Sequence, residues 1–485
     1  TGSIHEEKFL GAGISHFVEH LAIGSTTSVR SEKEYVDWVE RIGGNSNAYT
    51  TFNHTAYFLD VNKEYTEDAI QILSETMQFS IFTEEEVARE KDVIIKEFVY
   101  RVAPPMASMS NRMMEVTYLK SHIRNEIIGD IELFKGLARE DLLEYYSERY
   151  VPNNMIFVIS GDVDIEKTFE MVKEAFKDFK RGSLKPVYNP TENPRVGEYK
   201  HIEEFDINQA RGFITHLIPG CSYRDFLAIE ITADILFYKR NSPVQYRLSE
   251  ELELANWVFA YLNQGHYSDD VSLNIIFEAR EPKNMDIIVE EIDKKIQEIL
   301  QDGIRQEQID EVINRKRAEK VLQVQTPMRE AMNIGRNMLA YGLPDVYDIH
   351  MKEYERLTPE DIMWAVKHYF ADTNRVIFYG VPLGTKELVE EREDIAVSDI
   401  SKLELDSITV LHKQNSKDPM IHSYIYLPVS SDYETLENAG SFQVMVDMMF
   451  WGGTKSFDSM EFESWLEDRY ITLRANITQN GLYIQ

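Results

Sequence analysis

The chain has 485 residues, too many for one hydrophobic core, so we expect two or three domains. Hydrophobic residues make up 43% and charged residues 28% of it, which is typical of a soluble globular protein. The net charge of −32 argues against nucleic acid as a partner, because phosphate would be repelled; an acidic surface either attracts cationic substrates or simply keeps the protein in solution.

Cysteine usage limits the metal chemistry. The single cysteine, Cys221, can form no internal disulfide and no thiolate cluster, so any metal must be bound by His, Asp or Glu. No window approaches twenty consecutive apolar residues, and we therefore expect no membrane span in this chain. This composition is compatible with a soluble protein of the bacterial periplasm but does not fix the compartment.

The first motif in chain order is GISHFVEHLAIGST, residues 13 to 26. On a helix, His16 and His20 project from the same face, and Glu19 lies beside them. This is the geometry of a metal site. A catalytic zinc needs three protein ligands, so the third must come from another element.

A helix is predicted next, from Ser31 with its capping partner Glu34 to the glycines at 43 and 44. The stretch NSNAYTTFNHTAYFLDV, residues 45 to 61, has β-branched and aromatic residues on both sides of Asn53 and predicts a pair of strands. A further helix is expected at about 66 to 80.

Another helix starts at Thr83, with Glu86 as its capping partner, and ends before Pro104. Glu90 and Glu97 lie two turns apart on it and therefore share a face. Either carboxylate could meet the two histidines. The alternative is that both are solvated glutamates on an exposed helix.

An internal repeat organises the rest of the chain. Residues 137–164 resemble residues 357–384: each segment predicts a helix and then a buried strand, ending at Gly161 or Gly380. The stretch between the copies at 180–200 is polar, contains three prolines and suits a linker.

A second similarity relates the two ends of the chain. Residues 430–470 resemble residues 3–43, but Gln443, Val446 and Asp447 stand near the positions of the metal motif. Residues 403–429 predict strands that have no counterpart before Thr1. We therefore expect a chain that lacks its first strands and ends early in a third unit.

These repeats predict three units. Their expected bounds are 1–185 for a first, zinc-binding catalytic unit, 186–399 for a second, non-catalytic unit, and 400–485 for the start of a third that lacks the metal motif. The fold class is α+β, with helices packed over a largely antiparallel sheet in each unit.

The motif resembles that of the inverted zincins, the metallopeptidase family of pitrilysin, insulin-degrading enzyme and the mitochondrial processing peptidases. Their signature is His-x-x-Glu-His followed 76 residues later by a glutamate, which His16, Glu19, His20 and Glu97 match with residues 21–96 intervening. NAYTTFNHTAY, after the second helix, and PNNMIFVISGDV, which closes the first unit, extend the resemblance.

The resemblance implies one Zn²⁺ per chain, bound by His16, His20 and Glu97. It implies Glu19 as the general base of a zinc endopeptidase that cleaves small or unfolded peptides, and Glu90 as the family's second glutamate, which supports the catalytic site.

The family also suggests where a peptide substrate would bind. Asn47 and Ala48 would lie on an edge strand beside the metal, to which an extended peptide adds as a further strand. For Asn47 the alternative is an ordinary turn or strand residue.

The resemblance places this chain as the N-terminal half of a longer, four-unit protein. Its partner would be the missing C-terminal half of the same polypeptide. A homodimer is a further possibility. The rival function is a non-catalytic scaffold, since some family members keep the fold and have lost ligands, whereas this chain keeps all of them. A purely structural zinc would be closed by four ligands and would not need Glu19.

Overall fold

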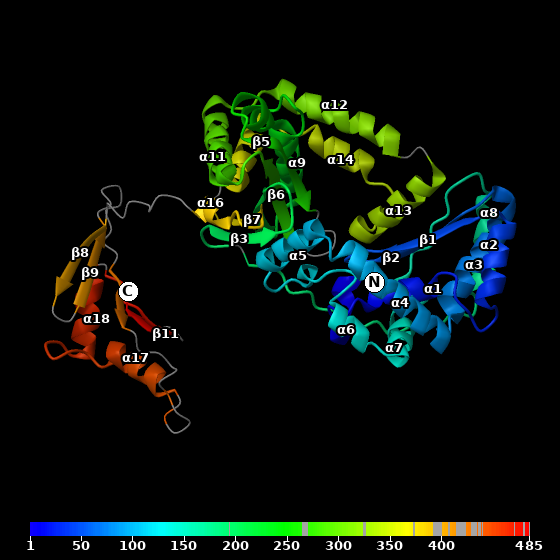
Figure 1. Ribbon diagram of the computed structural model, residues 1–485, viewed down its shortest axis with the longest axis horizontal. Helices are drawn as coiled ribbons and strands as arrows, with labels where there is room; N and C mark the ends of the chain where they lie inside the picture. The colour runs from blue at the N-terminus through cyan, green and yellow to red at the C-terminus, as the bar shows by residue number, and fades with distance from the viewer. Residues whose placement is uncertain are drawn as a thin grey trace. The chain divides into compact units, whose positions relative to one another are not determined.

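Figure 1 shows a computed structural model of the chain. It describes residues 1–193, 195–263, 270–323, 326–371, 374–390, 400–405, 408–413, 423–427, 434, 438, 440–469, 471–478 and 481–484. Contacts divide the chain into two compact units, Thr1–Glu391 and Arg392–Gln485. The boundary predicted at 399 falls in residues 391–399, outside the described residues.

The N-terminal part of the first unit is mainly helical around one hairpin. Its strands are β1 (Asn45–Thr50) and β2 (Thr55–Asp60), which pair antiparallel with each other. Its helices are α1 (Ile14–Ala22), α2 (Glu32–Arg41), α3 (Thr66–Phe79), α4 (Glu84–Arg101), α5 (Pro105–Thr117), α6 (Ile131–Gly136), α7 (Arg139–Arg149) and α8 (Ile165–Phe176).

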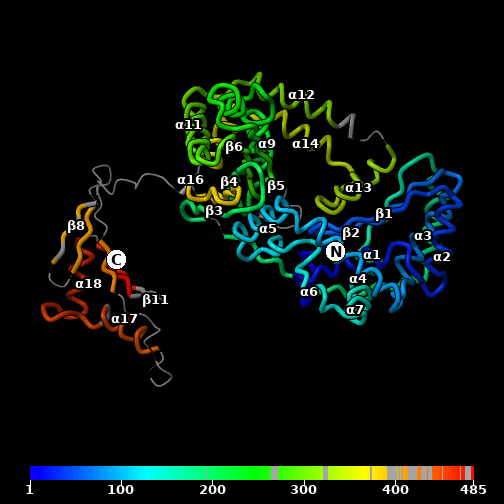
Figure 2. The backbone as a smooth tube through the Cα atoms, in the orientation of Figure 1, coloured from blue at the N-terminus to red at the C-terminus, as the bar shows by residue number. Residues whose placement is uncertain are grey.

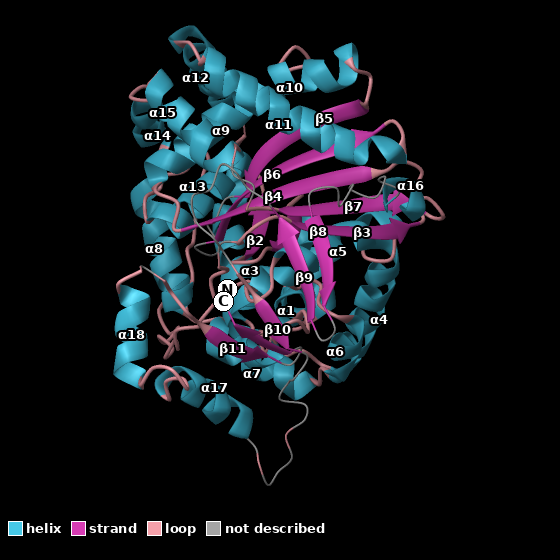
Figure 3. Cartoon of the chain, turned by 90° about the vertical axis from the view of Figure 1, so that its left-hand side faces the viewer, coloured by secondary structure: helices cyan, strands magenta, loops and turns pink. Residues whose placement is uncertain are grey.

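The rest of the first unit is built on a five-stranded sheet, seen almost face-on in Figure 3. The strands are β3 (Tyr199–Phe205), β4 (Arg211–Pro219), β5 (Ala255–Asn263), β6 (Asp270–Ala279) and β7 (Val376–Pro382), in the spatial order β3-β7-β4-β6-β5. Only the β3–β7 pair is parallel. The α+β class with a largely antiparallel sheet is therefore confirmed.

The remaining helices of this unit are α9 (Tyr223–Phe237), α10 (Pro243–Tyr246), α11 (Met285–Asp302), α12 (Gln306–Gln323), α13 (Pro327–Tyr341), α14 (Tyr347–Tyr354), α15 (Pro359–Ala365) and α16 (Lys386–Glu390). Helices α9 and α11 contribute to the large core on one face. On the other face, Met109 and Met113 of α5 pack against Phe213 and Phe378.

The second compact unit contains the residues predicted to begin a third unit. Its elements are β8 (Ile400–Leu405), β9 (Ile408–Lys413), β10 (Ile425–Leu427), α17 (Ser441–Trp451), α18 (Ser459–Glu467), β11 (Ala475–Thr478) and β12 (Gly481–Ile484). β8 pairs with β9, and β10, β12 and β11 form a separate antiparallel sheet. None of the helices that the structure describes is long and apolar enough to cross a membrane.

The predicted capping boxes define the helices that frame the hairpin. Ser31 and Glu34 cap each other at the start of α2, and Thr83 and Glu86 do so at the start of α4, which confirms both predictions. The strand pair around Asn53 and the helix at 66–80 are confirmed as well.

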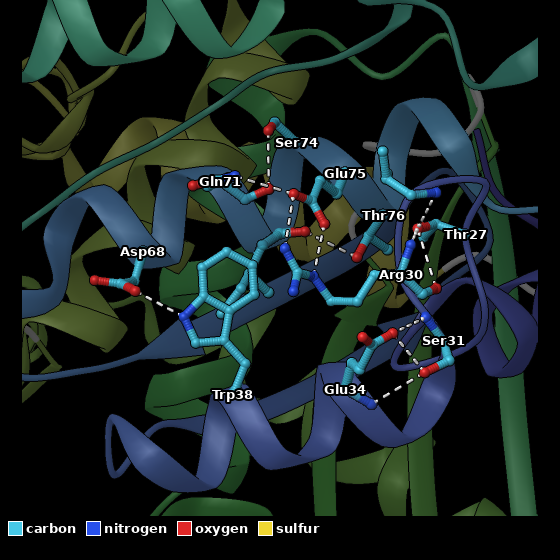
Figure 4. A network of polar contacts seen from close by, with 12 residues as sticks. Thr27, Arg30, Ser31, Glu34, Trp38, Asp68, Gln71, Ser74, Glu75 and Thr76 are labelled. Carbon is cyan, nitrogen blue, oxygen red and sulfur yellow. Dashed lines mark hydrogen bonds and ion pairs between the residues drawn. The ribbon is translucent and has the colours of Figure 1, made fainter.

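Polar contacts join α2 to α3 (Figure 4). The Arg30 guanidinium donates to the Glu75 carboxylate over 3.0 Å and lies 4.1 Å from the centre of the Trp38 ring. The Trp38 indole N–H donates to Asp68 over 2.6 Å. Arg30 and Trp38 therefore hold the outer helix α2 against α3.

One predicted strand is absent. Residues 155–160 were expected to form a buried strand equivalent to β7, but they are extended without belonging to any sheet, and Ile156 and Phe157 are exposed. β7 itself is confirmed and is paired on both edges. The prediction for residues 155–160 is wrong because apolar periodicity reports a preference for the extended backbone and does not supply the neighbouring strands.

The start of α1 is held by close contacts. Gly13 has a φ of +69°, and a Cβ at this position would lie 2.0 Å from the carbonyl oxygen of Ile128. The backbone N–H of Ser15 donates to the buried Glu6 carboxylate over 2.8 Å, which satisfies an amide in the first turn of the helix. These contacts fix the position from which the histidine helix starts.

Gly13→Ala should lower the free energy of unfolding by about 2 kcal/mol or more, because the new methyl would meet both the left-handed backbone and the Ile128 carbonyl. Gly136→Ala is the matched control, since a Cβ there meets nothing within 4 Å, and it should change the free energy by less than about 0.5 kcal/mol. Urea denaturation measures both. Equal effects would show that the Ile128 contact does not constrain α1.

The pH dependence of stability should carry a contribution from Glu6. Burial raises its pKa from 4.5 to about 8 in the folded protein. The unfolded chain therefore loses this proton first, and the free energy of unfolding should fall as pH rises from about 5 to 8, with a slope of up to about 1.4 kcal/mol per pH unit. Glu6→Gln should remove this component of the slope, and an unchanged slope would contradict the assignment.

Candidate metal centre

Helices α1 and α4 face each other and carry all of the predicted metal-binding side chains. The apolar residues Phe17, Val18 and Leu21 of α1 are fully buried, as is Ile94 of α4. Phe17 and Phe98 both contact the ring of Phe134, with centroid distances of 5.0 and 5.7 Å. This packing fixes how both helices are rotated and turns their polar side chains toward each other.

The structure brings His16, His20 and Glu97 together. Glu97 Oε2 lies 3.4 Å from His20 Nε2 and 3.8 Å from His16 Nε2. One donor atom from each of the three residues lies within 4.8 Å of the other two, and no other such group occurs among the described residues. Donors around a tetrahedral zinc are separated by about 3.4 Å, so the arrangement fits this ion with a small adjustment.

His20 and Glu97 are each bound by a second side chain at the atom that points away from the site. Glu90 Oε2 lies 3.4 Å from Nδ1 of His20, which leaves Nε2 directed at the site. The guanidinium of Arg101 binds Glu97 Oε1 over 2.8 Å and leaves Oε2 for the histidines. A carboxylate behind a ligating imidazole is the usual support of a zinc-bound histidine. Glu90 therefore lies where a supporting residue would be, and it is not a solvated glutamate.

The protonation of the two histidines differs. Burial, with the positive charges of His20 and Arg101, lowers the pKa of His16 to about 3, so its imidazole is neutral, as a metal ligand must be. Burial also acts to lower the pKa of His20. The hydrogen bond to Glu90 and the charges of Glu19 and Glu97 outweigh it and raise that pKa. The same hydrogen bond lowers the pKa of Glu90.

Glu19 lies beside the three donors without being one of them. Its side chain is buried, and burial raises its pKa, while the hydrogen bond from Thr50 Oγ1 to Glu19 Oε2 over 2.6 Å opposes the shift. The nearby charge of Glu97 raises the pKa further. An oriented carboxylate with a raised pKa is suited to taking up and giving back a proton.

Strand β1 passes beside this group with one edge unpaired in the described structure. Thr51 N–H donates to the carbonyl of His54, and because antiparallel bonding alternates, the amides of Ala48 and Thr50 point away from β2. The outward amide of Ala48 donates to the side-chain oxygen of Asn47 over 2.8 Å. Asn47 and Ala48 thus lie at the open edge of β1, where they were predicted.

Two contacts of the site were missed by sequence reasoning. Thr50, the hydroxyl partner of Glu19, stands in an unremarkable strand, and nothing in its spacing points to α1. Arg101 follows Glu97 by four residues on the same helix, so that contact was readable from the sequence.

The chain is similar to proteins of one peptidase family. Residues 1–131 match the family model described as insulinase (peptidase family M16), and residues 136–316 match the peptidase M16 inactive domain. An uncharacterized zinc protease of Rickettsia felis is 25% identical over 366 residues, covering 74% of this chain and 82% of the relative. The beta subunit of the mitochondrial-processing peptidase of Saccharomyces cerevisiae is 26% identical over 370 residues, covering 73% and 79%.

The fold is also shared with a solved structure. The crystal structure of a protease from Helicobacter pylori superimposes with a TM-score of 0.69 at 22% sequence identity, covering 79% of this chain and 92% of that one. Together, the two family models cover most of the first compact unit and include both helices of the metal centre. The chain therefore belongs to peptidase family M16, the insulinase family.

Proposed function

We propose that this chain is a zinc-dependent endopeptidase that cleaves small or unfolded peptides. The observation that carries the proposal is the convergence of two imidazoles and one carboxylate from α1 and α4, with Glu19 beside them and not among them. A structural zinc site would use a fourth protein ligand and would have no need of this additional acid. The relatives named zinc proteases support the same reading.

His16, His20 and Glu97 would hold the zinc ion through Nε2, Nε2 and Oε2, the atoms that face one another. When bound, zinc supplies Lewis acidity that polarises a peptide carbonyl and lowers the pKa of a bound water from about 15.7 to about 7. Glu90 and Arg101 keep the donors oriented from behind.

Glu19 is the proton carrier of the proposed reaction. Its carboxylate takes a proton from the water that attacks the peptide carbonyl and delivers a proton to the departing amine. Thr50 holds the Oε2 atom, which limits the rotation of the carboxylate. The raised pKa brings Glu19 closer to neutrality, where acceptance and release of a proton are both feasible.

The substrate would bind as an added strand on the open edge of β1. The outward amides of Ala48 and Thr50 can donate to the carbonyls of an extended peptide, with little demand on its sequence. The side-chain oxygen of Asn47 now occupies the position of such a carbonyl on Ala48, and Asn47 would turn away when a peptide binds.

Glu19→Gln should keep about one zinc per chain and slow the cleavage of an unstructured, quenched peptide by about a hundredfold or more, because an amide cannot take up the proton. Glu40→Gln on the exposed side of α2 is the matched control and should cleave normally. Metal analysis and fluorescence measure both quantities, and a chelator should abolish cleavage until zinc is restored.

Each other outcome of this experiment is informative. Loss of zinc in Glu19→Gln would make Glu19 a ligand, and full activity would remove it from the mechanism. If the unmodified chain holds zinc and cleaves nothing, either the C-terminal half of the longer polypeptide is required or the protein is a scaffold, and the same assay on the longer polypeptide separates the two.

Glu90→Gln should weaken zinc binding by about 10- to 100-fold, because the amide orients His20 less firmly and polarises it less. Competition with a chromogenic chelator measures the affinity. Glu85→Gln, exposed in the first turn of the same helix, is the control and should bind zinc as the unmodified chain does. Equal affinity of both variants would show that Glu90 does not support the site.

A further inference from the structure

Glu90 has a second charged partner besides His20. Arg89 precedes Glu90 on α4, and its guanidinium joins Glu90 to Glu32, the first residue of α2. The chain that runs from α1 to α2, blue in Figure 2, passes beside α4 and brings Glu32 to this position. We call the contacts of Arg89 with Glu32 and Glu90 the Arg89 bridge.

Every nitrogen of the Arg89 guanidinium is used in the bridge. Nε donates to Glu90 Oε1 over 3.1 Å. The two terminal nitrogens donate to the two carboxylate oxygens of Glu32 over 3.0 and 2.7 Å, in the parallel arrangement of a bidentate pair. Glu32 therefore sets the orientation of this planar group, and Nε is the donor that remains for Glu90.

The two oxygens of the Glu90 carboxylate have different partners. Oε1 accepts from Arg89, and Oε2 lies 3.4 Å from Nδ1 of His20. The terminal torsion of a glutamate is broad, and rotation about it here would break the contact with Arg89. Arg89 therefore keeps Oε2 on His20, which in turn keeps Nε2 of that ring directed toward Glu97 and the proposed metal position.

Glu32 is itself fixed by the backbone around it. Its N–H donates to Thr26 Oγ1 over 3.2 Å, and the Thr26 N–H donates to Glu86 Oε1 over 2.7 Å at the start of α4. Ser31 caps α2 immediately before Glu32. Isolated surface ion pairs contribute little, because two long side chains must be ordered to form them. Here other contacts already hold the helices that carry both ends of the bridge, so less conformational freedom is lost.

We propose that Arg89, held by Glu32, is a positioning residue of the metal centre, which fixes the Glu90 carboxylate so that His20 meets the metal through Nε2. Arg89 would act through Glu90, and Glu32 through Arg89. The inference rests on the proposed zinc site and deepens it, because it adds a contribution from α2 to a centre otherwise built from α1 and α4.

Zinc affinity tests the order of these contacts. Arg89→Met keeps a straight, helix-forming side chain and removes the guanidinium, and it should weaken zinc binding about three- to tenfold in competition with a chromogenic chelator. Glu32→Gln should weaken binding by a smaller factor, because Arg89 keeps Glu90 but loses its charged bidentate partner. In the Arg89→Met background, Glu32→Gln should have no further effect, since Glu32 acts only through Arg89.

Three further measurements separate positioning from a general loss of stability. Arg89→Lys keeps the charge but not the planar fork, so it should bind zinc more weakly than the unmodified chain. The side chains of Arg89 and Glu32 are 46% and 39% exposed, so salt screens the bridge, and the effect of Arg89→Met on zinc affinity should shrink between about 0.1 M and about 1 M NaCl. The visible spectrum of Co²⁺ bound in place of zinc should shift in Arg89→Met, because it reports ligand geometry.

Asp37→Asn is the matched control. It removes the exposed ion pair between Asp37 and Lys33 on the same helix α2, and it should leave zinc affinity unchanged. Equal zinc affinity of Arg89→Met and the unmodified chain would overturn the inference and leave the proposed zinc site intact. Full affinity in Arg89→Lys, or an effect of Glu32→Gln that persists without Arg89, would also overturn it. If the unmodified chain binds no zinc, the proposed metal site fails and the inference fails with it.

Discussion

The packing of α1 against α4 is the constraint on which the rest of the site depends. Two histidines and three glutamates of these helices lie together with little exposure to water, so the charge of each has a strong effect on the others. Polar contacts alone would not hold them there, because burying charged groups costs free energy. The aromatic cluster of Phe17, Phe98 and Phe134 offsets that cost and sets the rotation of both helices.

The three glutamates of this site differ in their surroundings, and this difference carries the roles proposed for them. Glu97 faces the histidines with Oε2 and binds Arg101 with Oε1. Glu90 faces the far nitrogen of His20 and is favoured in its charged form. Glu19 is buried, touches a hydroxyl and has its pKa raised. Environment, and not residue type, separates the proposed ligand, the proposed support and the proposed proton carrier.

Much of this could be predicted from the sequence where the governing contact is local. The spacing of His16, Glu19 and His20 fixes their common face, and capping pairs at Ser31 and Thr83 mark the starts of α2 and α4. The pairing of α1 with α4 came from the resemblance to a family, since no local rule states which helices meet.

The misses share a physical cause. Thr50 reaches Glu19 only because β1 crosses α1, and residues 155–160 form no strand because a strand needs at least one paired neighbour and the described structure gives them none. Both facts depend on tertiary contacts, which the periodicity of side chains along the sequence does not report.

The N-terminal part of the first compact unit, around the hairpin β1–β2, and the rest of that unit, around the five-stranded sheet, differ in how many strands they contain. In the second half, β4 separates β6 from β7, and Phe277, Phe378 and Tyr379 around it are buried completely. In the N-terminal part, the hairpin β1–β2 packs on α1 and α3. The metal centre is well formed in spite of this, because α1 and α4 are held by their own aromatic core. Among the described residues, β1 is paired with β2 alone, so the geometry of its open edge depends on the hairpin and on the contacts of β1 with α1.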